Sequence, residues 1–148
     1  MSSLIITIIS IALAAALALA GMYFGGDAFN QGSAKAAAAT VVNQAQQISG
    51  SNTLFFLDEQ AYAADVATLV SGDYLASAPN PGKITASDYV LATNGTITLE
   101  GLTTAVCDAV NEQAGVEARP ADAAAAAALP AQFSCYGDVG GTGTFVFK

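Results

Sequence analysis

The sequence predicts an α+β chain with one long N-terminal hydrophobic helix packed on a small antiparallel-sheet head that ends in a disulfide loop. Three observations predict this fold class. An uncharged apolar run comes first, an alanine-rich stretch with helical spacing follows it, and short alternating stretches then appear together with two cysteines. A chain of 148 residues suffices for one small domain and an appended element. We therefore divide it into residues 1–33, the hydrophobic segment, and residues 34–148, the head.

The apolar run from Leu4 to Phe24 carries no charge and is long enough to cross a hydrocarbon core of about 30 Å as a helix. It could be a cleaved signal peptide, a permanent anchor, or a polymerisation helix that enters the membrane only before assembly. Ala18-Leu19-Ala20 resembles a signal-peptidase site, but no Lys or Arg precedes the run, so we do not expect cleavage there. The residues assigned to a polymerisation helix are Leu4, Ile5, Ile8, Ile9, Leu13, Leu17 and Phe24.

A glycine-rich segment follows the apolar run. Each glycine in a helix costs about 1 kcal/mol relative to alanine. The sequence therefore predicts a helix that is partly melted near Gly21–Gly32, with Gly21, Gly25, Gly26 and Gly32 as the helix-melting residues. Apolar residues then recur at spacings of three and four from Ala34 to Ile48, which predicts an amphipathic second half that continues to about Leu57.

The remaining head elements are shorter. The pattern predicts a helix over 64–70, a hairpin of strands 89–91 and 96–99, a helix over 102–114 and a last strand over 142–147. Asn94-Gly95 predicts a type I′ turn, which we favour over an N-glycosylation sequon ending at Thr96. Six consecutive alanines between Pro120 and Pro130 could form a helical turn or an ordered coil, and we favour a loop of small residues over a close contact between subunits.

The residue types argue against an enzyme. The chain has no His, and Asp58-Glu59 occupies adjacent helix positions whose side chains point apart, as at a solvated helix end. The glycine-rich stretch from Asp138 to Gly143 lacks the lysine of a phosphate loop and is predicted to be a turn. We expect no catalytic residue, no cofactor and no metal.

The net charge and the two cysteines limit which partners and which sites are expected. The net charge is −8, with only four basic residues, which argues against direct binding of nucleic acid. Cys107 and Cys135 form an even pair in a chain with an export-like N-terminus, which favours a disulfide. A lone pair without His cannot supply the four ligands of a structural zinc site.

An uncharged N-terminal helix, an amphipathic continuation and an α+β head together resemble a type IV pilin. Residues 39–50 resemble the second half of the long helix in the type IVb branch. Residues 69–75, with Pro79 beyond, resemble the segment that enters the pilin αβ-loop, and residues 106–111 with Cys135 resemble the disulfide-bounded D-region. The resemblance spans the whole chain.

The resemblance implies a major pilin, the structural subunit of an extracellular filament. Its expected partners are further copies of itself, the inner membrane before assembly and a pilus assembly machinery. Such filaments serve adhesion, motility, DNA uptake, conjugation or phage reception. The alternatives are a membrane-anchored pseudopilin and an extracytoplasmic binding module held by a single anchor.

One departure from the family concerns the N-terminus. Pilins usually carry Glu at mature position 5, where this sequence has Ile5 when Met1 is counted first. We expect neutral groups to hold the terminus instead, either backbone carbonyls or the hydroxyls of Ser2, Ser3, Thr7 or Ser10. Register would then depend on packing of the stripe from Leu4 to Leu19, and filaments would tolerate high salt.

Overall fold

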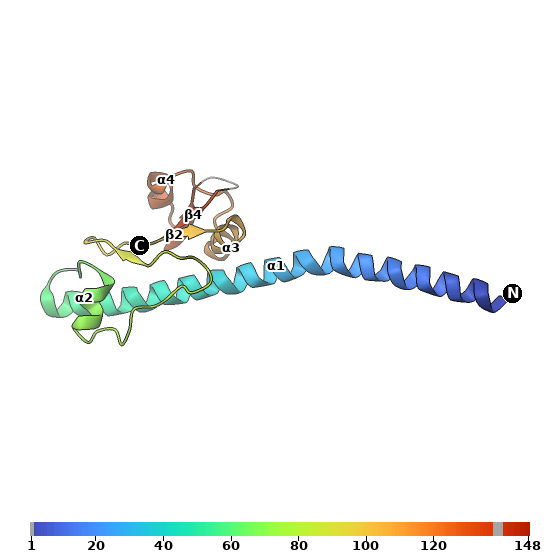
Figure 1. The fold of residues 1–148 in the computed structure, drawn as a ribbon. Helices are drawn as coiled ribbons and strands as arrows, with labels where there is room; N and C mark the ends of the chain where they lie inside the picture. Colours follow the sequence, from blue (N-terminus) through green and yellow to red (C-terminus); the bar gives the residue numbers. More distant parts are fainter. Residues whose placement is uncertain (1, 138–140) are drawn as a thin grey trace. The chain divides into compact units, whose positions relative to one another are not determined.

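The computed structural model describes residues 2–137 and 141–148, without the side chains of Ser2, Phe24 and Asp27. In chain order the elements are α1 (Ser2–Glu59), α2 (Val66–Ser71), β1 (Val90–Leu91), β2 (Ile97–Leu102), α3 (Thr104–Ala114), α4 (Ala123–Ala128), β3 (Phe133–Tyr136) and β4 (Gly143–Phe147) (Figure 1). The predicted α+β class is confirmed. The chain divides into two compact units, Met1–Ser33 and Ala34–Lys148.

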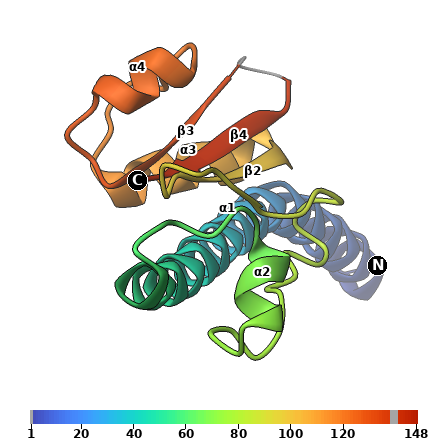
Figure 2. The same cartoon turned by 90° about the vertical axis from the view of Figure 1, so that its left-hand side faces the viewer.

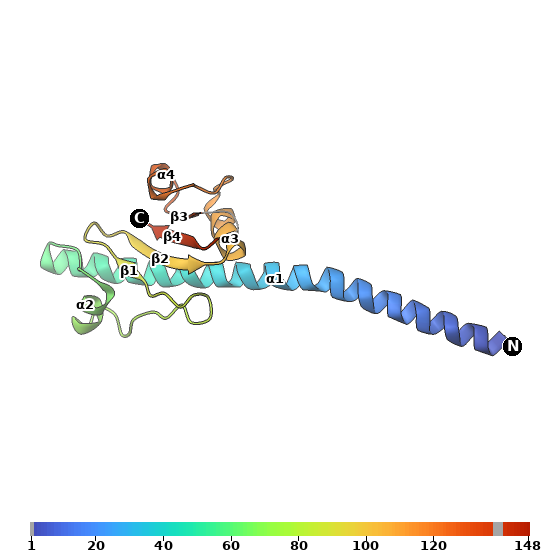
Figure 3. The same cartoon turned by 45° about the horizontal axis from the view of Figure 1, so that its top comes forward.

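The four strands form one antiparallel sheet in the order β1-β2-β4-β3 (Figure 3). Strands β3 and β4 are paired with Cys135 opposite Phe145, and β2 and β4 with Leu99 opposite Phe145. Because side chains alternate between the faces of a sheet, this register places Cys135, Phe145 and Leu99 on one face and Ser134 and Val146 on the other. The first face is the core face.

The core of the head lies between this face and two helices. One side of α1 supplies Ala38, Val41, Ala45 and Ile48, all fully buried. Helix α3 adds Val110 and further buried residues from the same side of the sheet. The amphipathic half of the long helix is thus confirmed, and its apolar residues at helical spacing cover the sheet.

The opposite face of the sheet is covered by α4 (Figure 2). Of the helical turn and the ordered coil that the sequence left open for this segment, the structure has the helix, Ala123–Ala128, in place of the favoured loop. The carboxylate of Asp122 accepts a hydrogen bond from the Ala125 amide at 2.8 Å and caps the first turn. The Lys148 ammonium donates to the carbonyls of Ala127 and Leu129 at 3.0 and 2.7 Å at the other end. Side-chain hydrogen bonds therefore hold both ends of α4, the helix that covers this face of the sheet.

The helix is not melted at its glycines, so that prediction is wrong for the chain described here. Helix α1 runs unbroken through Gly21–Gly32. Each glycine costs about 1 kcal/mol, but a break would force the chain to nucleate a new helix and would leave about four N–H and about four C=O groups without helical partners. Continuing the helix avoids these costs.

The hairpin between β1 and β2 is confirmed, but its predicted type I′ turn is not. A type I′ turn needs positive φ at both central residues. Here Gly95 has φ 85°, whereas Asn94 is not among the described non-glycine residues with positive φ. The Gly95 amide donates to the Ala92 carbonyl at 2.9 Å and the Ala92 amide to the Thr96 carbonyl at 2.8 Å, so the turn is one residue longer than predicted.

Candidate functional site

The N-terminal part of α1 exposes apolar side chains on every side. All described side chains from Ser3 to Ser33 are exposed. The assigned residues Leu4, Ile5, Ile8, Ile9, Leu13 and Leu17 are 53 to 68% exposed, and the side chain of Phe24 lies outside the described residues. Within the described residues α1 is the one helix long and apolar enough to cross a membrane, and it could serve as an anchor or a signal sequence.

This exposure is energetically costly in water. Burying one leucine or isoleucine side chain is worth about 1.5–3 kcal/mol. The six assigned residues with described side chains account for only part of the exposed apolar surface. A contiguous apolar surface of this extent on a water-soluble monomer is exceptional and marks contact with lipid or protein. The segment therefore requires an apolar cover.

Two hydroxyls inside this segment are already hydrogen-bonded within the helix. The hydroxyl of Thr7 donates to the Ser3 carbonyl at 2.7 Å, and that of Ser10 donates to the Ile6 carbonyl at 2.8 Å. The two hydroxyls thus add no unpaired donor to the apolar surface, while their oxygens can still accept a hydrogen bond. Met1 lies outside the described residues, so the expected contacts of its amino group stay a prediction.

The glycines of the segment are not required by packing within the chain. A Cβ atom added at Gly21, Gly25, Gly26 or Gly32 would meet no atom within 4 Å beyond its own helix surroundings. Their described conformation is helical and accepts any residue. The structure thus leaves room for close approach by a neighbour along this stretch.

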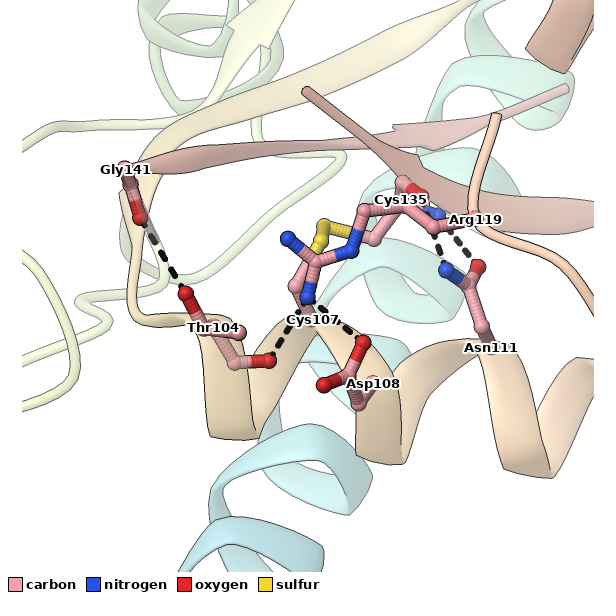
Figure 4. The surroundings of a disulfide bond; sticks show 7 residues. All are labelled: Thr104, Cys107, Asp108, Asn111, Arg119, Cys135 and Gly141. Atoms are coloured by element: carbon pink, nitrogen blue, oxygen red, sulfur yellow. Dashed lines mark hydrogen bonds and ion pairs between the residues drawn. A yellow bond between two sulfur atoms is a disulfide. The ribbon is translucent and has the colours of Figure 1, made fainter. Parts of the chain in front are cut away.

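The C-terminal part of the head is organised around a disulfide (Figure 4). Cys107 on α3 and Cys135 on β3 are bonded, as predicted, and both are fully buried. Gly143 lies directly beside them, and a Cβ atom there would be 2.5 Å from Cys107 Sγ and 3.0 Å from Cys135 Sγ. The first residue of β4 must therefore be glycine for the strand to pass the sulfur atoms.

A buried asparagine joins the same two elements. Asn111 on α3 donates from Nδ2 to the Cys135 carbonyl and accepts from the Cys135 amide through Oδ1, both at 2.8 Å (Figure 4). Asn111 is only 4% exposed. Sequence reasoning missed this contact, although a polar residue in phase with the buried Cys107 and Val110 was a signal for it.

A buried arginine ties down the loop that follows α3. The Arg119 side chain is 7% exposed and donates to Asp108 Oδ1 at 2.6 Å and to the Thr104 carbonyl at 2.9 Å. Both acceptors belong to the first part of α3 (Figure 4). The contact uses one of the four basic residues for structure, and sequence reasoning had no signal for its partner.

Tyr89 couples the hairpin to α1 and makes the head sensitive to alkali. Its hydroxyl donates to Gln44 Oε1 at 2.8 Å, and burial raises the pKa of Tyr89 above its ordinary value of 10.0. A raised pKa means that the folded state keeps the proton longer than the unfolded state. The resulting stability is fully present below about pH 10 and is lost as the pH rises through the folded pKa.

We therefore expect Tyr89→Phe to flatten the loss of unfolding free energy above about pH 10, while costing about 1 kcal/mol at neutral pH through the lost hydrogen bond. Denaturant unfolding at a series of pH values measures both effects. Tyr62→Phe is the control, because Tyr62 is exposed and its ring stacks on Phe56, a contact that phenylalanine preserves. An alkaline slope unchanged by Tyr89→Phe would contradict the assignment.

The described residues contain no group of three His, Cys, Asp or Glu side chains placed to hold a metal ion. The Asp58-Glu59 pair lies at the end of α1, exposed to solvent. Comparison with protein-family models, curated proteins and solved structures finds no match to this chain. Among the described residues, two features stand out, the exposed apolar segment of α1 and the buried disulfide of the head.

Proposed function

We propose that this chain is the structural subunit of an extracellular filament resembling a type IV pilus, and that it polymerises through the N-terminal half of α1. The observation that carries the proposal is the all-round exposure of apolar side chains along this segment. Lipid covers them before assembly, and the same segments of neighbouring copies cover them afterwards. Repetition of one heterologous contact without closure gives a helical polymer.

The head supports this proposal in two ways. A buried disulfide is typical of proteins that fold in an oxidising compartment outside the cytoplasm. The chain also has a net charge of −8, and a net charge far from zero keeps a head that faces water soluble. The chain needs no enzymatic chemistry for this role, because other proteins drive extension.

The test is a charge placed in the apolar segment. Leu13→Asp leaves the head untouched, since the Leu13 side chain is 58% exposed, but it costs about 2.5–3.5 kcal/mol in a membrane. We expect the variant to give no filaments in electron micrographs of material sheared from producing cells. Leu13→Met is the matched control and should assemble normally.

The same preparation separates the rival functions. Long filaments of the unaltered chain support a major pilin, and only short assemblies would indicate a pseudopilin. Native material that gives monomers in mild detergent and no filaments would indicate a binding module on a single anchor, and would overturn the proposal.

A further inference from the structure

The head has a surface hollow between the loop after α3 and the loop after α4. Its volume is about 550 Å³, and its apolar lining consists of Ala114, Val116, Ala118, Leu129, Pro130 and Ala131. A second hollow of about 410 Å³ adjoins it and shares Gly115, Val116 and Glu117. Glu117 therefore lies where the apolar hollow meets a second hollow with a more polar lining.

The charge at this junction is not compensated within the head. Glu112, on the rim of the second hollow, pairs with Lys35 at 2.9 Å. Glu117 is exposed and makes no hydrogen bond or ion pair with any described residue. The hollow thus offers an apolar surface with one free carboxylate.

The basic residues leave one candidate for this carboxylate. Lys35 is paired with Glu112, Arg119 with Asp108, and Lys148 is bound to the end of α4. Lys83 is exposed and, among the described residues, has no such partner. It is the cation that the head leaves available.

Lys83 follows a turn that is held in one shape. Asn80 Oδ1 accepts a hydrogen bond from the Gly82 amide at 2.6 Å, and Gly82 has φ 64°, which glycine adopts without strain. Gln44 of α1 donates from Nε2 to the Asn80 carbonyl at 3.0 Å. A preordered turn loses little conformational entropy on binding.

We propose that the turn ending at Lys83 docks in the Glu117 hollow of a second copy of this chain. The contact rests on the proposed function and adds a head-to-head interface to it. The turn and the hollow are different surfaces of one head, so the contact is heterologous and can repeat along a filament. Opposite charges at its centre select register more than they add affinity.

The test is a charge reversal with rescue. Lys83→Glu and Glu117→Lys are made separately and together in the full chain, and filaments sheared from producing cells are quantified. Each single reversal should lower the filament yield about tenfold, because like charges then face each other, and the double reversal should restore it to within about twofold. Glu100→Lys, at an exposed acid on β2, changes the charge equally and should leave the yield unchanged. Carbodiimide treatment of wild-type filaments should join Lys83 to Glu117 of another copy.

Single reversals that assemble as well as wild type would overturn the contact and leave the proposed function intact. A double reversal without rescue would also overturn it. Near-ultraviolet circular dichroism checks that each variant head is folded, which both exposed positions permit. Wild-type chains that form no filaments would overturn the proposed function and this contact together.

Discussion

Gly143→Val is expected to unfold the head or to prevent the disulfide from closing. A Cβ atom at this position would lie 2.5 Å from Cys107 Sγ and 3.1 Å from Cys107 Cβ, and valine adds two further methyl groups. Neither sulfur can move away, because both are buried and bonded to each other. Overpacking of a buried position typically costs about 1–3 kcal/mol, and this contact is tighter than usual, so we expect at least the upper end.

Denaturant unfolding of the full chain in mild detergent, followed by tyrosine fluorescence, measures the loss. Gly141→Val is a suitable control, because Gly141 is exposed and its position precedes the strand. A Gly143→Val chain with wild-type stability and an intact disulfide would show that β4 can shift away from α3.

Removal of the disulfide has the second large effect. Cys107 and Cys135 are 28 residues apart, and closure of a loop of that length removes denatured-chain entropy worth about 3–4 kcal/mol. Cys107→Ala together with Cys135→Ala should lower the unfolding free energy by this amount without changing the fold, since both positions stay apolar. The same unfolding measurement detects it. The wild-type chain in a reducing agent is the parallel sample, and equal midpoints with and without the disulfide would contradict the expectation.

Sequence patterns predicted the elements that depend on local periodicity. The apolar stripe of Ala34–Ile48, the hairpin, and the helix that carries Cys107 appear where the spacing of apolar residues placed them. The oxidised state of the cysteines followed from composition. These features need no knowledge of distant contacts.

Elements that depend on distant partners were missed or left open. Six alanines are too few for a stable isolated helix, and α4 is held by the sheet beneath it and by Lys148, a residue 20 positions beyond its end. Strand β3 is four residues long and is recognised only through its pairing with β4. The glycines of α1 led to the opposite error, a break predicted where the helix continues. The cost of each glycine within a helix was weighed, but the cost of ending the helix was not.

The contact between Asn111 and Cys135 also protects one edge of the sheet from pairing with another strand. Strand β3 is an outer strand of the sheet, and the outward amide and carbonyl of Cys135 would otherwise invite a strand from a neighbouring molecule. The Asn111 side chain occupies both groups, and the Pro120 carbonyl accepts from the Gly137 amide farther along. At the other edge β1 is only two residues long. Both edges are therefore poor templates for a strand from a neighbouring molecule, which opposes aggregation through a continuous intermolecular sheet.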